Sequence, residues 1–395
     1  MRQTEITCRL AGLGSAKWGV HLKAKELTAQ GQDIIAMTIG EPDVPMPDEL
    51  VEAAVVAMRK GRTTYSSGAG EAGLRNALAE RYSHSTGRTI SDNQVLCFPG
   101  TQTALFAVCM GVAETGCEVI VGDPMYATYE GVIRATGADV VPVPLKPQCG
   151  FRIAAGDIAD RLTSKTSAIL LTTPHNPTGA VLNDTDIAAI GALAIKHDLW
   201  LISDEVYAEL IFDGVEFSSP LAHPELADRV IVVSSISKSH AAPGFRSGWC
   251  VGPESFTAML LPLSETMLFG NQPFIADMTE QGIRNGSSVA PGMTQRFARR
   301  AKELHNRLSR DTLLQVHRPQ AGMFAMIDVS ATGMNGNDYA LHLLEYGKVA
   351  VMPGISFGSS LESWVRVALT LEDAAFTEAC DRIIAHAKSL EQVTA

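Results

Sequence analysis

The chain of 395 residues has few of the residues that mark disulfide-rich or metal-binding proteins. Its seven cysteines are odd in number, and none falls in a CxxC or a Cys/His ligand spacing. Disulfide frameworks need paired cysteines, and structural zinc needs clustered ones. The sequence therefore predicts a reduced, cytoplasmic protein with no metal site.

Basic residues and long apolar stretches are also scarce. Lys and Arg number 32 against 43 Asp and Glu, a formal net charge of −11. Nucleic acids and anionic membranes bind clustered positive charge, so neither is expected as a partner. The longest run of apolar residues and glycine, Ala104 to Ala113, is well short of the roughly 20 residues of a spanning helix. The polar start, MRQTEITCRL, does not resemble a secretory signal.

Short apolar runs rich in β-branched residues alternate with longer helix-like stretches between residues 46 and 287. The helix-like stretches include 101–113 and 185–196. Such alternation predicts a mostly parallel sheet flanked by helices, and we assign residues 46–287 to one large α/β domain. The expected strands are Val95–Phe98, Glu118–Val121, Ala168–Thr172, Trp200–Ser203, Val230–Ser234 and Trp249–Val251.

The C-terminal part has a different pattern. Candidate strands at 323–329, 349–352 and 364–368 lie between two segments with apolar residues at helical spacing. We expect a smaller α+β domain formed by residues 288–395 and completed by residues 1–45. The apolar residues at helical spacing are Phe297, Ala301, Leu304 and Leu308 in the first segment, and Phe376, Cys380, Ile383, Ala387 and Leu390 in the second.

Polar segments follow four of the expected strands. Ligands bind at the carboxyl ends of the strands in parallel α/β sheets, so these segments are expected to form one site. They are PGTQTA (99–104), TPHNPTG (173–179), DEVY (204–207) and SISKSHAAPGFRSGW (235–249).

Two basic residues follow the Val230–Ser234 run. Lys238 is surrounded by serines, and a lysine in a weakly charged site can lose its proton and form a Schiff base. Arg246 lies in a loop after Pro243 and Gly244, where a guanidinium could bind a phosphate. Taken singly, such a lysine is more often a solvated surface residue, and such an arginine is at least as often part of a surface ion pair.

Other residues of these segments also have two interpretations. Asp204 ends an apolar run, where a carboxylate needs a cation such as a pyridinium nitrogen, or else forms a salt bridge or a helix cap. Gly100, Thr101 and Gln102 precede a helix-like stretch. Their N–H groups could bind an anion at the helix N-terminus, or they could form a plain N-cap.

The order of these motifs resembles one family. HNPTG, DEVY and S-x-S-K-x-x-x-x-x-G-x-R-x-G-W occur here in the order found in class I/II aminotransferases, pyridoxal-phosphate enzymes of fold type I. IGEPD (39–43) and Y-x-x-x-x-G-x-x-x-L-R (65–75) lie upstream, and PGxxFG (353–358) and WVRVAL (364–369) lie downstream. The resemblance covers nearly the whole chain and implies a large domain with a mostly parallel sheet and a smaller α+β domain.

Matched by position, the resemblance implies pyridoxal 5′-phosphate as cofactor, with Lys238 binding it covalently and then moving the substrate proton. Asp204 would keep the pyridine nitrogen protonated, so that the ring withdraws electrons. Asn176 and Tyr207 would hydrogen-bond the ring oxygen, and Tyr126 would stack on the ring. The implied phosphate ligands are Gly100, Thr101, Gln102, Ser235, Arg246 and, from a second subunit, Tyr65.

The resemblance also implies the substrate contacts. Arg366 would bind the α-carboxylate, helped by Asn176 and the backbone of Gly40. A second contact, at the amino group, would hold the Cα–H bond perpendicular to the ring. The implied role of Tyr65 requires a homodimer, and the other implied partners are small amino acids and 2-oxo acids.

Substrate preference rests on fewer residues. In related enzymes that take aspartate or prephenate, a lysine binds the second carboxylate, and Gln102 stands at that position here. The segments DPMYATYEG, DEVYAELIFDG and AGMFAMID are similar to the arginine:pyruvate transaminase branch of the family. We therefore expect arginine as donor and pyruvate as acceptor, with Glu41, Asp43 or another carboxylate at the side-chain end of the pocket.

Several alternatives stay open at this point. The chain could be an aromatic or aspartate aminotransferase, a carbon–sulfur β-lyase on the same scaffold, or a non-catalytic sensor. Among further residues, the basic cluster Arg296, Arg299, Arg300 and Lys302 is expected on a solvated helix face. His240 could gate the site or be a plain loop histidine. Trp18 and His21 could close over the pocket, although packing on a partner is favoured.

Overall fold

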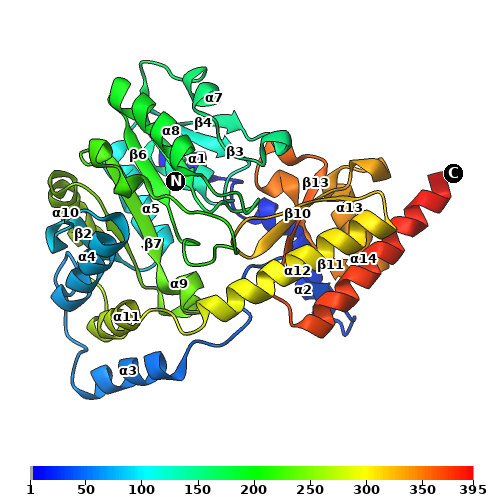
Figure 1. The fold of residues 1–395 in the computed structure, drawn as a ribbon, viewed down its shortest axis with the longest axis horizontal. Coiled ribbons are helices and arrows are strands. Elements are labelled where there is room, and N and C mark those ends of the chain that lie inside the picture. Colours follow the sequence, from blue (N-terminus) through cyan, green and yellow to red (C-terminus); the bar gives the residue numbers. More distant parts are fainter. Residues whose placement is uncertain (1–2, 395) are drawn as a thin grey trace.

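A computed structural model describes residues 3–394 of the chain. In this range the main strands form a seven-stranded and a four-stranded sheet. The helix α12 (Ala290–Asp311) runs from the large sheet to the small one (Figure 1). The domain limits 46–287, 1–45 and 288–395 stay a prediction, and residues 1, 2 and 395 lie outside the described residues.

The large sheet has the strand order β2-β8-β7-β6-β5-β3-β4. Pairing is parallel from β7 through to β4, whereas β8 runs antiparallel to both of its neighbours. This confirms the predicted mostly parallel sheet. Its strands are β2 (Val95–Phe98), β3 (Glu118–Asp123), β4 (Asp139–Pro144), β5 (Thr166–Thr172), β6 (Trp200–Asp204), β7 (Val230–Ser235) and β8 (Gly248–Val251).

The strand β4 was missing from the sequence prediction. It forms an edge of the sheet, carries two prolines and exposes or half-exposes most of its side chains. Proline is tolerated at an edge because one side of the strand needs no ladder hydrogen bonds. The buried strands, by contrast, are continuous apolar runs, as expected for a sheet that is covered on both faces.

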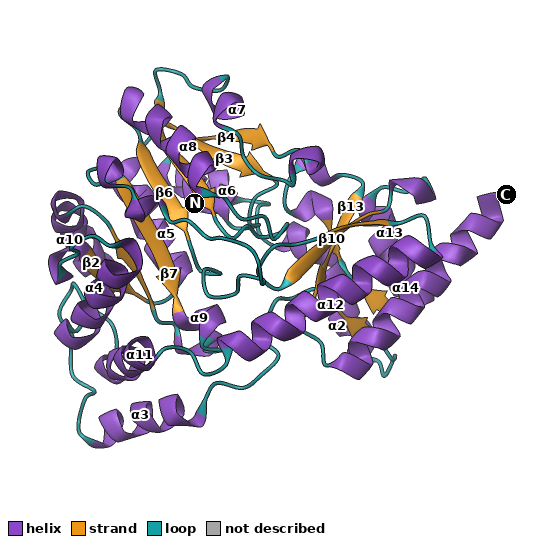
Figure 2. Cartoon of the chain, viewed as in Figure 1, coloured by secondary structure: helices purple, strands orange, loops and turns teal. Residues whose placement is uncertain are grey.

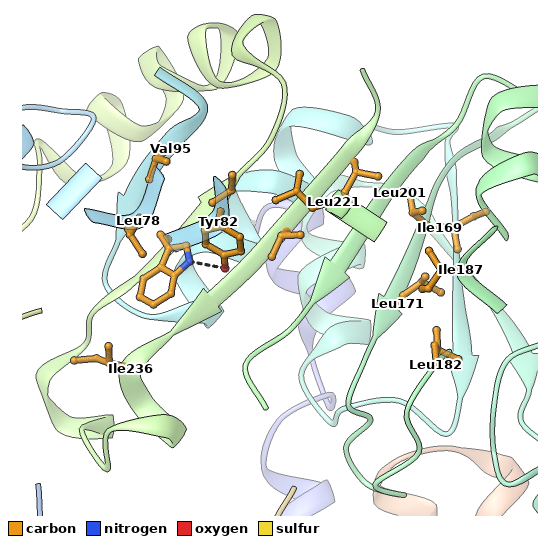
Figure 3. Close-up of a cluster of buried hydrophobic side chains, with 14 of the residues drawn as sticks. Leu78, Tyr82, Val95, Ile169, Leu171, Leu182, Ile187, Leu201, Leu221 and Ile236 are labelled. Carbon is orange, nitrogen blue, oxygen red and sulfur yellow. Dashed lines mark hydrogen bonds between the residues drawn. The ribbon is translucent and has the colours of Figure 1, made fainter. Parts of the chain in front are cut away.

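Alternate residues of each strand enter different cores. Ile169 and Leu171 of β5 pack with Ile187 in one core (Figure 3). Ala168 and Leu170 belong to the other core. Helices cover both faces of the sheet (Figure 2). The first core includes residues of α3 (Asp48–Arg59), α4 (Ala72–Thr86), α7 (Ala155–Ala159), α8 (Asp184–Lys196) and α11 (Pro273–Asn285), and the second includes residues of α5 (Thr101–Val112), α6 (Tyr129–Thr136) and α10 (Glu254–Leu268).

The smaller, antiparallel sheet has the order β12-β13-β10-β9. The predicted apolar faces of α12 and α14 pack against it in a core of their own. The other elements are α1 (Glu5–Leu10), α2 (Gly19–Ala29), α9 (Ile236–Ser239), α13 (Gly336–His342), α14 (Asp373–Thr394), β9 (Gln315–His317), β10 (Phe324–Asp328), β12 (Met352–Pro353), β13 (Trp364–Ala368) and the parallel pair β1 (Ile35–Ala36) and β11 (Val349–Ala350).

The basic cluster of α12 is not the uniformly solvated face that was expected. Arg300 is only 2% exposed. It donates hydrogen bonds to Asp43, to Asp373 and to the Leu369 carbonyl, and Arg296 binds Asp43 with two hydrogen bonds. The expectation was wrong for these two arginines, because their acidic partners come from segments remote in the sequence.

No helix within residues 3–394 is both long and apolar enough to cross a membrane.

Candidate active site

A cavity of about 240 Å³ lies at the carboxyl ends of β5, β6 and β7, between the large sheet and residues of the small one. Eleven of the thirteen predicted site residues line it. The polar segments that follow separate strands thus meet at one place, as expected from the parallel order of the sheet. The eleven are Gly40, Thr101, Gln102, Tyr126, Asn176, Asp204, Tyr207, Ser235, Lys238, Arg246 and Arg366.

The two remaining predicted residues lie elsewhere. Gly100 is the N-cap of α5 with φ +86°, and a Cβ there would lie 2.3 Å from Nη2 of Arg246. Glycine therefore allows the guanidinium to approach the helix N-terminus. Tyr65 is 86% exposed and touches Phe269 edge-on, away from the cavity of its own chain.

One end of the cavity suits a phosphate group. The N-terminus of α5 lies here with Ser235 and Arg246, and helix N-termini attract anions. The hydroxyl of Thr101 is buried without a hydrogen-bond partner among the described residues. Ser237 also lines this cavity, and sequence reasoning did not single it out, although it is the second serine of the S-x-S-K motif.

The carboxylate of Asp204 suits a cationic ring nitrogen. Asp204 is 5% exposed, and it accepts hydrogen bonds from the Tyr129 hydroxyl (2.7 Å) and the Val206 N–H (3.1 Å). Burial raises the pKa of Asp204 to about 6, against the effect of these two bonds. A bound cation would compensate the lost hydration of the carboxylate. Tyr129 is a second residue that the sequence did not identify.

Lys238 lies in the one-turn helix α9, directly after β7. Its Nζ donates a hydrogen bond of 2.7 Å to the Gly40 carbonyl. Burial, with the positive charges of Arg366 and Arg246, lowers the pKa of Lys238 to about 8, while Glu41 opposes the shift. An amine with such a pKa is partly neutral near pH 7, so it can act as a nucleophile or a base.

Arg366 lies on β13 and is 2% exposed. Its guanidinium is held between the rings of Phe324 (3.9 Å) and Phe357 (4.3 Å). It donates to the Thr38 carbonyl (2.7 Å) and to Oδ1 of Asn176 (3.0 Å). A positive group that is buried and fixed in this way can bind a carboxylate with two hydrogen bonds.

Asn176 connects this guanidinium to a tyrosine. Its Nδ2 donates to the Tyr207 hydroxyl at 3.3 Å. Burial raises the pKa of Tyr207, so the phenol stays neutral and can donate its proton to a bound oxygen atom. The two side chains together offer hydrogen bonds at the centre of the cavity.

Trp18, His240 and Asp43 differ in how they lie relative to the cavity. Trp18 lines the cavity, which favours closing over the pocket. His240 faces away, because its ring nitrogens contact Ser239 and the Gly282 carbonyl of α11. Asp43 is already bound by Arg296 and Arg300, so it is unsuited to bind a substrate guanidinium.

No cluster of three or more His, Cys, Asp or Glu side chains in residues 3–394 is arranged to hold a metal ion.

Comparison with known proteins gives consistent matches along the whole chain. A sequence profile of the family described as aminotransferase class I and II matches residues 32–383. Arginine–pyruvate transaminase AruH of Pseudomonas aeruginosa is 40% identical over 97% of both chains. Aspartate/prephenate aminotransferase of Thermus thermophilus is 32% identical over 87% of this chain and 89% of its own. The solved structure of aspartate aminotransferase from Thermus thermophilus with maleate has a TM-score of 0.92 at 29% identity and covers 98% of this chain and 100% of that one.

Proposed function

The chain belongs to the class I and II aminotransferases and is therefore a pyridoxal 5′-phosphate-dependent transaminase of fold type I, and from this premise we propose that it transfers the amino group of L-arginine to pyruvate. The observation that carries the proposal is the 40% identity to an arginine–pyruvate transaminase, which extends over 97% of both chains. The neutral side chain of Gln102 in the cavity supports it, because no cation stands there to select a second substrate carboxylate.

The cofactor would be held by residues at both ends of the cavity. When bound, pyridoxal phosphate supplies an electron-withdrawing ring that stabilises negative charge at the substrate Cα. Asp204 holds the proton on the ring nitrogen, and the buried, unpartnered hydroxyl of Thr101 gains a phosphate oxygen as its partner. Ser235 and Arg246 would bind the same phosphate, and Tyr126 would pack on the ring.

The substrate would be oriented by two groups of this chain. Arg366, whose guanidinium lies against the rings of Phe324 and Phe357, would bind the α-carboxylate. Asn176 and Tyr207 would hydrogen-bond the ring oxygen of the cofactor. With its α-carboxylate held by Arg366 and its amino group held at the cofactor, the substrate could not rotate freely. Its Cα–H bond would then face the amine of Lys238. Lys238, with its lowered pKa, would accept the proton from Cα at its Nζ and hold it on that side of the substrate.

A homodimer would complete the site. Tyr65 is 86% exposed in the single chain, and in this proposal it reaches the phosphate of the neighbouring subunit. Without that partner its hydroxyl has no role in the cavity.

A panel of amino donors tests the substrate assignment. Each amino acid is mixed with the cofactor-loaded enzyme, and the loss of the visible cofactor absorbance is followed in a single turnover. We expect arginine to bleach the absorbance fastest, and pyruvate to restore it. A strong response to aspartate or phenylalanine without one to arginine would refute the proposal. Release of pyruvate and ammonia from cysteine conjugates, with no 2-oxo acid added, would indicate the β-lyase instead.

A further inference from the structure

Residues 38–43, here called the lip, run beside the cavity, which Ile39 and Gly40 line, and they contact two of its cations. The Thr38 carbonyl accepts a hydrogen bond from Arg366, and the Gly40 carbonyl accepts one from Lys238. The lip has no helix or strand of its own. Its position therefore depends on what holds its two ends.

The start of the lip is fixed by backbone pairing. The Met37 N–H donates to the Ala350 carbonyl of β11, and the Met37 carbonyl accepts from the Ala368 N–H at the end of β13. The second of these bonds ties residue 37 to β13, the strand that carries Arg366.

The far end of the lip is fixed by side chains of α12. The carboxylate of Asp43 is 4% exposed and accepts hydrogen bonds of 2.8 Å from both Arg296 and Arg300. Burial alone would raise the pKa of Asp43, but the two guanidinium groups outweigh it and hold that pKa below its usual value. Asp43 therefore stays ionised and bound at neutral pH.

Arg300 connects this end of the lip to the substrate-binding strand. Besides Asp43, its guanidinium donates to the Leu369 carbonyl (2.9 Å), three residues after Arg366, and to Asp373 at the start of α14 (2.9 Å). One buried side chain thus spans the gap between the lip and β13. A buried, multiply bonded guanidinium is expensive to displace, because its partners would be left without hydrogen bonds.

The lip packs closely against Phe324, the ring that stacks on Arg366. A Cβ at Gly40 would lie 2.1 Å from Cζ of Phe324, and Phe324 stacks on the guanidinium of Arg366. The lip therefore cannot shift toward Phe324 without moving the ring that orients Arg366. Interiors packed this closely transmit small displacements.

We propose that Arg300 is a positioning residue for substrate binding, which sets the spacing between the lip and Arg366 that the substrate carboxylate requires. The inference rests on the proposed role of Arg366, but it does not depend on which amino acid is the donor. Arg300 itself does not line the cavity. It acts through Asp43 and β13.

The test compares Arg300→Met with a matched control on the same helix. Arg299→Met removes the same charge from the neighbouring position and also loses a bond to Asp373, but Arg299 makes no hydrogen bond or ion pair with the lip. We expect Arg300→Met to raise KM about tenfold for whichever amino acid and 2-oxo acid turn over, which corresponds to about one misplaced hydrogen bond. The dissociation constant of the cofactor should change less than about twofold in both variants. Arg299→Met should keep the wild-type KM.

A double-mutant cycle separates positioning from general stability. Combined with Arg366→Lys, Arg300→Met should add little to the rise in KM, while its lowering of the melting temperature stays the same. Additive effects on KM would overturn the inference. An unchanged KM in Arg366→Lys alone would instead refute the assignment of Arg366, so the two failures are distinguishable.

A second variant covers the case in which Arg300→Met does not fold. Asp43→Asn keeps the size of the side chain and both arginines, but it removes the negative charge and replaces one accepting oxygen with an NH2 group that cannot accept from a guanidinium. We expect the same selective rise in KM. A folded Asp43→Asn enzyme with wild-type KM would also overturn the inference.

Discussion

The ammonium group of Lys238 donates a hydrogen bond of 2.7 Å to the carbonyl of Gly40, which lies 198 positions earlier in the chain. The first group comes from α9, directly after strand β7 of the large sheet, and the second from the lip. The cavity is thus formed by two parts of the molecule.

Replacement of the lysine should abolish the chemistry without unfolding the protein. In Lys238→Ala no amine remains to bind the cofactor covalently or to move the Cα proton, so turnover and the visible absorbance of lysine-bound pyridoxal phosphate should both be lost. Absorbance spectra and a coupled transaminase assay check this, with Lys302→Ala, an exposed lysine of α12, as control. A yellow, active Lys238→Ala enzyme would contradict the assignment.

Cofactor attachment to the apoenzyme should depend on pH in a defined way. The pKa of Lys238 is about 8, and only the neutral amine attacks the aldehyde. Below this value the rate should rise about tenfold per pH unit, and it should level off above it. Stopped-flow absorbance between pH 6 and pH 10 measures the profile. A rate that is still rising at pH 10 would mean that the lysine has an ordinary pKa.

Asp204→Asn should stabilise the apoenzyme while it impairs the holoenzyme. Burial raises the pKa of Asp204 to about 6, above the value of about 3.9 in an unfolded chain. The folded state therefore holds this proton more tightly, and its stability falls as pH rises from about 4 to 6. At neutral pH the ionised, buried carboxylate lowers the free energy of unfolding by about 3 kcal/mol, and Asp204→Asn avoids this loss.

Urea unfolding of both proteins at pH 5 and pH 7.5 measures this difference in free energy. Without cofactor, the free energy of unfolding of Asp204→Asn should exceed that of the wild type by an amount that grows with pH. With saturating cofactor, this difference should vanish. A difference that does not vary with pH would show that the carboxylate is not strained by burial.

Gln102→Lys should shift substrate preference toward dicarboxylates. The new ammonium would attract a second carboxylate and repel a donor guanidinium, and one charge-assisted hydrogen bond corresponds to about tenfold in kcat/KM. The ratio of aspartate to arginine activity is the readout, with Gln102→Met as the uncharged control. If the two variants behave alike, Gln102 does not face the substrate side chain.

Tyr65 offers a test of the proposed homodimer. Tyr65→Phe should weaken cofactor binding about tenfold, because one hydrogen bond to the phosphate is lost. A mixture of Tyr65→Phe and Lys238→Ala chains can form heterodimers in which one site has both Lys238 and the partner's tyrosine. That site should bind the cofactor with wild-type affinity. No recovery on mixing, in samples that sediment as dimers, would place Tyr65 outside the neighbouring site.

Much of the fold could be predicted from local sequence pattern. The buried strands of the large sheet are continuous apolar runs, so their limits were predicted to within two residues. The apolar faces of α12 and α14 repeat at helical spacing, so these helices were predicted, although their ends were not. The edge strand β4 was missed because its exposed, proline-containing sequence has no such pattern. Edge strands owe their position to one neighbour rather than to burial on two faces.

The sequence by itself determined the chemistry of the site. The motifs with Asn176, Asp204, Lys238 and Arg246 follow strand-like runs, and the parallel order of a sheet places such segments together. The tertiary structure alone decided which neighbours act on them. The contacts of Asp204 with Tyr129, of Lys238 with Gly40 and of Asp43 with Arg300 join segments far apart in the chain. Burial and charge at a site depend on what is near in space, and spacing along a sequence does not record that distance.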